Sequence, residues 1–284
     1  MKLNSNSLQN IVKLAVNEDI GDGDHSSLAC IPRKKTGKSR LLVKQQGIIA
    51  GIEVAGIIFD TIDPNLHTKI YIPDGSEVKK GDVAFQVEGK VRSILQSERL
   101  VLNFMQRMSG IATQTSIYAD KLKDFHTQVL DTRKTTPGLR TLEKKAVALG
   151  GGSNHRMGLY DMIMLKDNHI DFAGGIDKAI RKTLKYLHKE NKQLKIEVEV
   201  RNLEEVREVL NTGGVDRIML DNFSPEKTRK AVELINGMFE TESSGNITLE
   251  NIRDYAECGV DFISVGALTH QIKSLDMSLK AIDF

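Results

Sequence analysis

The chain has 284 residues, of which 40% are hydrophobic and 27% are charged, a composition typical of soluble globular proteins. Its 40 Lys and Arg nearly balance its 38 Asp and Glu, and only 5% of its residues are aromatic, with no Trp, so no nucleic-acid partner is expected. The sequence has no secretory apolar region, and its apolar runs are all shorter than the about 20 residues that a membrane span needs. Its two cysteines are solitary, which fits a reducing compartment. These features predict a cytoplasmic protein without a membrane partner.

Residues 1–107 are predicted to form a small α+β domain. Apolar positions at helical spacing predict helices over residues 5–18 and 52–62. Alternating apolar and polar residues predict strands over 37–51, and short segments separated by glycine turns predict further strands over 72–91. The two kinds of pattern are mixed along the segment, as in α+β domains.

A long helix is predicted over residues 97–123, where apolar side chains recur at helical spacing. It carries the basic residues Arg99 and Arg107. Because basic residues on such a helix usually lie on its solvated face, the pattern alone places Arg107 in solvent.

The rest of the chain alternates between strand and helix patterns. The predicted strands cover residues 128–130, 162–165, 196–200, 217–220, 239–243 and 262–265. The predicted helices between or after them cover residues 176–187, 203–212, 225–238 and 249–258. Repeated strand and helix units form a parallel sheet with right-handed crossovers. Their number favours a closed or nearly closed barrel over a doubly wound sheet, and no glycine fingerprint for a dinucleotide follows a strand.

Charged side chains follow the ends of these predicted strands. In a β/α barrel the carboxyl ends of the strands converge on one mouth, where ligands bind. The candidates are the cations Arg133, Lys134, Arg156 and Lys166 with the neighbouring His155, and the acids Glu199 and Asp221. Glu197 and Glu199 point to the same side of their strand, so Glu199, nearer the mouth, is the site candidate and Glu197 a deeper partner of a cation.

Turns of small residues follow the last two predicted strands. Small side chains let backbone N–H groups face outward at a helix N-terminus, which is the usual way that a β/α barrel binds a phosphate. The turns contain Ser244, Gly245 and Asn246, and Val265, Gly266 and Ala267. With the cations and acids, they predict a site for a phosphorylated sugar and a second, strongly anionic molecule.

Several of these stretches together resemble one enzyme family. They are DTRKTTPGLR, GGGSNHRMGLYDMIMLKDNH, KIEVEV, IMLDN, ESSGNI and ISVGALT. The chain resembles the quinolinate phosphoribosyltransferases, which are also called nicotinate-nucleotide pyrophosphorylases (carboxylating), over nearly its whole length. The resemblance implies an incomplete (β/α) barrel preceded by a smaller α+β domain, with the boundary between residues 107 and 108. It also implies Mg²⁺-dependent chemistry and a homodimer or an assembly of dimers.

The resemblance assigns roles to the candidate residues. It implies that quinolinate and 5-phosphoribosyl-1-pyrophosphate are bound by Thr132, Arg133, Lys134, His155, Arg156 and Lys166. It implies that Glu199 and Asp221 face the ribose hydroxyls or the metal, and that the two turns of small residues receive the 5-phosphate. Lys134, Lys166, Glu199 and Asp221 are the implied catalytic residues. Arg99 matches an arginine that enters the active site of the neighbouring subunit.

One position departs from the family pattern, which often has two glycines where this chain has Gly245 and Asn246. Asparagine tolerates left-handed backbone geometry, so the turn is expected to survive. Three alternatives stay open: a related pyrophosphorylase-like protein of molybdenum transport, a nicotinate phosphoribosyltransferase without decarboxylation, and a phosphosugar-binding barrel without catalysis. Release of CO₂ from quinolinate separates the first two from the family reaction, and a product assay separates the third.

Overall fold

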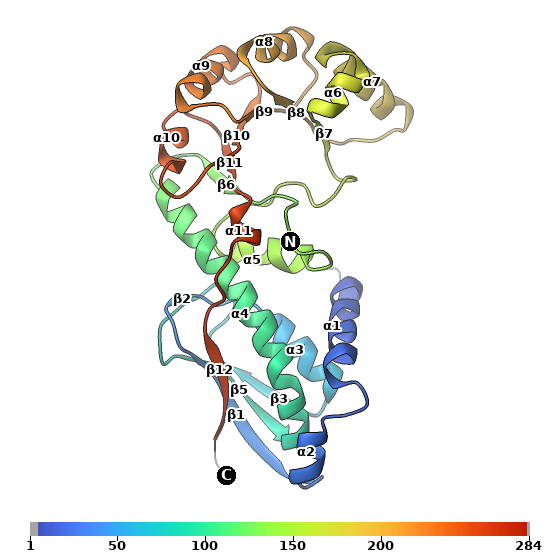
Figure 1. The fold of residues 1–284 in the computed structure, drawn as a ribbon, viewed down its shortest axis with the longest axis vertical. Coiled ribbons are helices and arrows are strands. Elements are labelled where there is room, and N and C mark those ends of the chain that lie inside the picture. Colours follow the sequence, from blue (N-terminus) through green and yellow to red (C-terminus); the bar gives the residue numbers. More distant parts are fainter. Residues whose placement is uncertain (1–4, 283–284) are drawn as a thin grey trace. The chain divides into compact units, whose positions relative to one another are not determined.

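The structure, a computed structural model, describes residues 5–282 (Figure 1). The chain folds into two compact units. The first contains the described residues up to Ser116, Thr135–Gly151 and those from Leu268 onward, and the second contains Ile117–Lys134 and Gly152–Ala267. The chain therefore passes between the units several times, and the predicted boundary between residues 107 and 108 stays a prediction.

An antiparallel sheet forms the centre of the first unit, in the order β12-β1-β5-β3. Its strands are β1 (Thr36–Val43), β3 (His67–Ile70), β5 (Val83–Lys90) and β12 (Met277–Ile282), and a separate pair is formed by β2 (Gly47–Ile48) and β4 (Glu77–Val78). The helices are α1 (Ser5–Ile20), α2 (His25–Cys30), α3 (Ile52–Ile62), α4 (Val91–Leu122), whose residues from Ile117 onward belong to the second unit, and α5 (Arg140–Leu149). The sequence patterns did not predict β3, α5 or β12.

Helix α3 shows how the sequence produces these elements. Its apolar positions, among them Ile58 and Phe59, are buried, and Phe59 meets Phe85 of β5 edge to face with ring centroids 5.7 Å apart. The N–H of Ile52 donates to Oδ1 of Asp74 at 2.9 Å, which satisfies a free donor of the first turn. The predicted range 52–62 is confirmed.

The expectation that Arg107 lies in solvent is wrong. Its guanidinium is half-buried and donates to Oε1 of Glu143, at 2.9 Å from Nε and 2.6 Å from Nη2, and to Oγ1 of Thr136 at 2.6 Å. Glu143 lies on α5 with only 1% of its side chain exposed. Because α5 was not predicted, nothing in the periodicity of α4 indicated a buried partner for this arginine.

A six-stranded parallel sheet forms the second unit, in the order β6-β11-β10-β9-β8-β7. The strands are β6 (Gln128–Leu130), β7 (Ile163–Leu165), β8 (Ile196–Val200), β9 (Arg217–Asp221), β10 (Glu240–Ser244) and β11 (Phe262–Ser264). Within the described residues β6 and β7 are not paired with each other, so the barrel is incomplete. Only a single bridge, Leu130 to Ser153, adds the start of the GGGSNHR segment beside β6.

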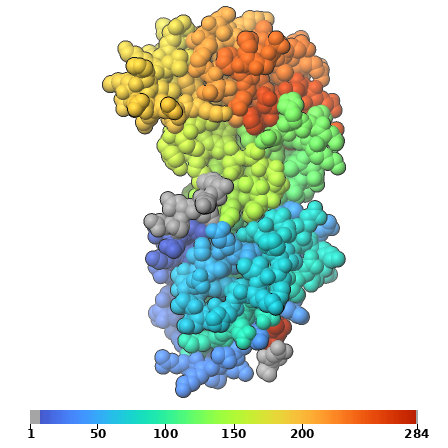
Figure 2. Space-filling view, turned by 180° about the vertical axis from the view of Figure 1, so that it is seen from behind, coloured from blue at the N-terminus to red at the C-terminus, as the bar shows by residue number. Residues whose placement is uncertain are grey.

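Helices follow the strands and line one side of the curved sheet (Figure 1). They are α6 (Asp167–Ala173), α7 (Ile176–Lys189), α8 (Leu203–Thr212), α9 (Pro225–Ile235) and α10 (Ile252–Ala256). The short helix α11 (Ala267–His270) follows β11, and its residues from Leu268 onward belong to the first unit. The residues of α7 to α10, yellow to red-orange, make up much of the surface of the second unit that Figure 2 shows. No helix within residues 5–282 is both long enough and apolar enough to cross a bilayer.

Short side-chain caps set the beginnings of the outer helices. Oδ1 of Asn202 accepts the N–H of Glu205 at the start of α8, and Oγ of Ser224 accepts the N–H of Lys227 at the start of α9. Asn236, with φ of 46°, caps α9, which ends at Ile235, three residues before the predicted end. Helix α10 has only five residues, fewer than the predicted range 249–258, and α11 has four.

Two glycines of the first unit give a stability prediction. A Cβ at Gly110 of α4 would overlap the carbonyl oxygen of Lys273, whereas a Cβ at Gly56 of α3 meets nothing within 4 Å. Gly56→Ala should raise the free energy of unfolding by about 0.5–1 kcal/mol through helix propensity. Gly110→Ala should lower it by about 1–2 kcal/mol, because overpacking against backbone outweighs the same gain. Urea denaturation of both variants checks this, and equal stabilisation by both would contradict the packing of α4.

Candidate active site

An ion pair joins the ends of β7 and β8 in the second unit. Lys166 directly follows β7, and its Nζ donates to Oε2 of Glu199 at 2.9 Å. Lys166 is also the N-cap of α6, where its N–H donates to Nδ1 of His169 at 3.0 Å. The KDNH sequence therefore fixes the lysine backbone. Its ammonium group stays accessible, with 45% of the side chain exposed, while Glu199 is almost buried.

A chain of amide hydrogen bonds fixes Asp221 at the end of β9. Nδ2 of Asn222 donates to Oδ2 of Asp221 at 2.8 Å, and Nδ2 of Asn246 donates to Oδ1 of Asn222 at 3.1 Å. Both asparagines have positive φ, 55° and 51°. A Cβ at Gly245 would overlap Oδ1 of Asn222. Position 245 therefore requires glycine, and Asn246 keeps the left-handed turn that the sequence predicted for it.

Several cationic side chains lie at the same edge of the sheet as Glu199 and Asp221. Lys134 and Arg133 are exposed after β6, and the N–H of Lys134 donates to Oγ1 of Thr132 at 3.0 Å. Arg156 is 9% exposed and donates from Nη1 to the carbonyl of Met162 at 3.3 Å. Burial and the nearby charge of Arg133 lower the pKa of Arg156. Two guanidinium groups close enough to repel each other are stabilised by an anion bound between them.

Asp131 attaches the GGGSNHR segment to β6. This carboxylate is fully buried, and it accepts the N–H of His155 at 2.9 Å and Nδ2–H of Asn154 at 2.7 Å. The next backbone N–H, that of Arg156, donates to Nδ1 of His155 at 2.6 Å. The positions of His155 and Arg156 thus depend on Asp131, which was not among the predicted site residues. Its position directly after a predicted strand was the available signal.

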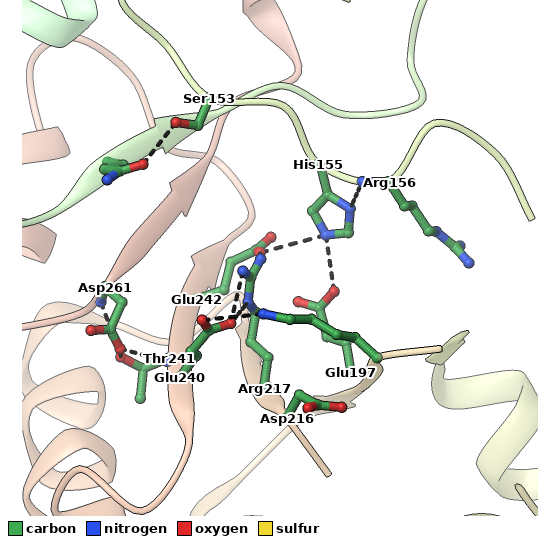
Figure 3. A network of polar contacts seen from close by, with 12 residues as sticks. Ser153, His155, Arg156, Glu197, Asp216, Arg217, Glu240, Thr241, Glu242 and Asp261 are labelled. Carbon is green, nitrogen blue, oxygen red and sulfur yellow. Dashed lines mark hydrogen bonds and ion pairs between the residues drawn. The ribbon is translucent and has the colours of Figure 1, made fainter. Parts of the chain in front are cut away.

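A layer of buried charge lies deeper in the sheet, with Glu197 on β8, Arg217 on β9 and Glu242 on β10 (Figure 3). Arg217 donates from Nη1 to Oε2 of Glu242 at 2.9 Å and from Nη2 to Oε2 of Glu240 at 3.0 Å, and its guanidinium stacks 3.9 Å from the ring centre of Phe262. Burial raises the pKa of Glu197 to about 7 and that of Glu242 to about 8. Glu197 lies deeper than Glu199, as the strand parity predicted.

The turns after β10 and β11 differ in what they offer a ligand. Ser244 and Gly245 are partly exposed and Asn246 is exposed. Val265 is buried, and its N–H donates to the carbonyl of Leu130 at 2.9 Å, so this donor is already used by the sheet. Gly266 is partly exposed at the start of α11. Because the helices that follow are so short, any phosphate contact relies on individual N–H groups rather than on a helix dipole.

The second unit contains almost all of the predicted site residues. At or near the carboxyl ends of its strands lie Thr132, Arg133, Lys134, His155, Arg156, Lys166, Glu199, Asp221, Ser244, Gly245, Asn246, Val265, Gly266 and Ala267. Arg99 does not belong to this cluster, since it is exposed on the part of α4 that lies in the first unit. Arg217, Glu242 and Asp131 are charged groups beneath the cluster that sequence reasoning did not select.

Comparison with known families agrees with this arrangement. The family model described as quinolinate phosphoribosyl transferase, N-terminal domain, matches residues 24–109, and the model of the C-terminal domain of the same family matches residues 111–280. The chain belongs to the quinolinate phosphoribosyltransferase family.

Individual members of the family are similar over nearly their full length. Quinolinate phosphoribosyltransferase [decarboxylating] 2b, mitochondrial, of Nicotiana tabacum is 48% identical over 288 residues, covering 96% of this chain and 82% of that protein. A probable nicotinate-nucleotide pyrophosphorylase [carboxylating] of Bacillus subtilis is 42% identical, covering 92% of this chain and 89% of that protein. The crystal structure of NadC from Streptococcus pyogenes matches with a TM-score of 0.94 and 40% identity over 100% of both chains.

The fold prediction is thereby confirmed: a small α+β domain accompanies an incomplete parallel α/β barrel, and the NadC structure matches both over its whole length. The structure also gives the local environment of each side chain. A dicarboxylate or a pyrophosphate would bind between the guanidinium groups of Arg133 and Arg156. A sugar on which positive charge develops would face the carboxylates of Glu199 and Asp221.

Proposed function

We propose that this chain transfers the phosphoribosyl group of 5-phosphoribosyl-1-pyrophosphate to quinolinate, giving nicotinate mononucleotide, CO₂ and pyrophosphate, as a step of NAD biosynthesis. The observation that carries the proposal is the presence of two kinds of charge at the carboxyl edge of the parallel sheet. Arg133 and Arg156 are cations close enough to repel each other. Lys166 follows β7 and pairs with Glu199 near the end of β8, and Asp221 is the last residue of β9. The names of the similar family members support the same reaction.

The cations suit the two anionic substrates. The planar guanidinium of Arg156 and that of Arg133 can each bind a carboxylate through two parallel hydrogen bonds, which matches the adjacent carboxylates of quinolinate. Lys134 and Lys166 supply compact charges for the pyrophosphate. Ser244, Gly245, Asn246 and Gly266 are proposed to receive the 5-phosphate, whereas Val265 contributes through packing because its N–H already bonds within the sheet.

The carboxylates suit the first chemical step. The ring nitrogen of quinolinate attacks C1 of the ribose as the bond to pyrophosphate breaks, and positive charge develops on the sugar. Glu199 and Asp221 favour that charge, while the lysines favour the negative charge of the leaving group. Because Asp221 is oriented by Asn222 and Asn246, it needs no reorganisation when charge develops.

The second step removes CO₂ from the carbon beside the ring nitrogen. The carbon–carbon bond breaks, its electron pair stays on the ring carbon, and a proton then takes the place of the carboxyl group. The ring nitrogen, which became quaternary in the first step, stabilises that electron pair, so the protein's part is to hold the ring in position.

Mg²⁺ is proposed as the metal of the reaction. Asp221 and Glu199 offer carboxylate oxygens at neighbouring strand ends, and Mg²⁺ binds through one or two carboxylates together with substrate phosphates and waters. These residues therefore fit the ion. When bound, it would neutralise charge on the pyrophosphate.

We also propose a homodimer, or an assembly of dimers, in which Arg99 of one chain enters the site of the other. This proposal is supported by the exposure of Arg99 on α4. Arg99 is also the one predicted site residue that lies in the first unit, whereas the others lie in the second unit.

We propose a cytoplasmic location from the sequence alone. The names of similar proteins from tobacco and rice specify mitochondrial and chloroplastic forms.

Loss of one cation should remove most of the activity. Lys134→Ala should lower kcat for nicotinate mononucleotide formation by about a hundredfold to a thousandfold, the equivalent of about 2.7–4 kcal/mol of transition-state stabilisation. Because Lys134 is exposed, the fold should not change, whereas Arg156→Ala also removes a bond to Met162 and needs a thermal-stability control. Product and CO₂ are measured together, with Lys189→Gln on the outer helix α7 as the matched control. Normal turnover by Lys134→Ala would remove this lysine from the mechanism.

Sharing of Arg99 can be tested by mixing inactive variants. If Arg99 acts in the partner's site, co-refolded Arg99→Ala and Lys134→Ala chains form about one half heterodimers with one intact site each, so about a quarter of wild-type activity returns. The control mixture is Lys134→Ala with Glu199→Ala, two changes in the same unit, which should recover nothing. Recovery in neither mixture would show that Arg99 is not contributed by a second chain.

A further inference from the structure

Two fully buried glutamates have no part in the reaction described so far. Glu197 and Glu242 have 0% exposed side chains, and the ring of His155 points toward both (Figure 3). Nε2 of His155 lies 2.9 Å from Oε2 of Glu197 and 3.5 Å from Oε2 of Glu242. A buried carboxyl group is costly without polar partners, so such a cluster is retained for a structural or functional reason.

The hydrogen on the His155 ring can be placed from its other nitrogen. Nδ1 accepts the backbone N–H of Arg156 at 2.6 Å, so Nδ1 carries a lone pair and no hydrogen. This acceptor role corresponds to a neutral ring with its hydrogen on Nε2, the atom that faces the two glutamates. A ring in this state supplies no positive charge to an anionic substrate, and both of its nitrogens are directed to protein groups.

The same placement argues against a metal ion among these side chains. His155, Glu197 and Glu242 bring ligand atoms within 4.8 Å of one another, which is a plausible geometry for a cation site. A nitrogen that carries hydrogen cannot be a metal ligand, however, and Arg217 already occupies Oε2 of Glu242 at 2.9 Å. Glu197 is also influenced by the positive charges of Arg217, Arg156 and Lys166. The cluster therefore suits the hydrogen of a neutral ring and the guanidinium of Arg217 better than it suits a metal ion.

The cluster is connected to the mouth through the backbone. Asp131 fixes the N–H of His155, and the ring of His155 fixes the N–H of Arg156. The Arg156 side chain then extends away from the glutamates, as Figure 3 shows, toward the carbonyl of Met162. If the His155 ring adopted another rotamer, the backbone N–H of Arg156 would lose Nδ1 as its acceptor, and the backbone that carries the Arg156 side chain would no longer be held in place.

We propose that Glu197 and Glu242 are positioning residues, which hold the neutral His155 ring beneath the mouth so that Arg156, and not His155, contacts the carboxylates of the substrate. This assignment rests on the proposed function for the identity of that substrate. It changes the role of His155 from a ligand of quinolinate to a support for the arginine that follows it in the chain.

The state of the ring can be measured without any activity. Long-range ¹H–¹⁵N correlation spectra of the ¹⁵N-histidine-labelled, substrate-free protein should show His155 as a neutral ring with hydrogen on Nε2 and a bare Nδ1. The signal is assigned by its loss in His155→Asn, since the chain has seven histidines. A cationic ring, or hydrogen on Nδ1, would overturn the proposal even if the enzyme is a fully active phosphoribosyltransferase.

Kinetics then separate positioning from contact. Glu197→Gln and Glu242→Gln should each raise KM for quinolinate about tenfold, as loss of an outer-shell partner does, with KM for the ribosyl pyrophosphate changed less than about threefold. The amides keep the volume of the carboxyl groups, and thermal melting confirms that the variants fold. Glu240→Gln is the matched control, because Glu240 binds the same Arg217 but is 37% exposed and not within the His155 cluster. Equal effects from all three variants would contradict the proposal.

Two substitutions of His155 complete the test. Asn places Oδ1 close to the position of Nδ1 and can still accept the Arg156 N–H, whereas Leu cannot. His155→Asn should therefore retain most of the affinity for quinolinate that His155→Leu loses. Equal loss in both would mean that the imidazole itself contacts the substrate. If wild-type protein makes no nicotinate mononucleotide, the proposed function fails, while the spectra still decide the state of His155.

Discussion

The site depends on the common direction of six parallel strands. Because every strand of the sheet points the same way, a residue that follows any of them lies at the same edge. Lys166, Glu199 and Asp221 are far apart in sequence, yet they end β7, β8 and β9, which pair in that order. A reversal of one strand would move its terminal side chain to the opposite edge of the sheet.

Position along the strand then divides the charges on this face into an outer and an inner layer. Glu197 and Glu199 differ by one pleat, but Glu199 pairs with a half-exposed lysine while Glu197 is sealed beside Glu242. Arg217 offsets part of the inner negative charge, and burial raises the pKa of both inner carboxyl groups. The inner layer supports the segment that carries Arg156, and the outer layer faces the substrates.

Much of the second unit could be predicted because its signals are local. Strands such as 196–200 and helices such as 203–212 follow directly from apolar periodicity and from caps like Asn202. The strand-end rule then identified most of the candidate residues. The family resemblance, rather than periodicity, supplied the substrates.

Features that depend on distant partners could not be predicted in this way. The pairing of β12 with β1 joins residues more than two hundred positions apart, and no local pattern indicates it. Arg107 was misplaced because its partner Glu143 lies on an unpredicted helix. The roles of Asp131, Arg217 and Glu242 appear only when hydrogen-bond partners are known, because a charged residue in or after a strand has the same sequence signal whether it is buried or exposed.

The most direct test of the account is a crystal structure of the protein bound to quinolinate. The carboxylates of the ligand should lie within hydrogen-bonding distance of Arg133 and Arg156 at the carboxyl edge of the parallel sheet, with Lys166 beside them. A ligand bound at full occupancy away from these three side chains would contradict the claim that the strand ends form the substrate site.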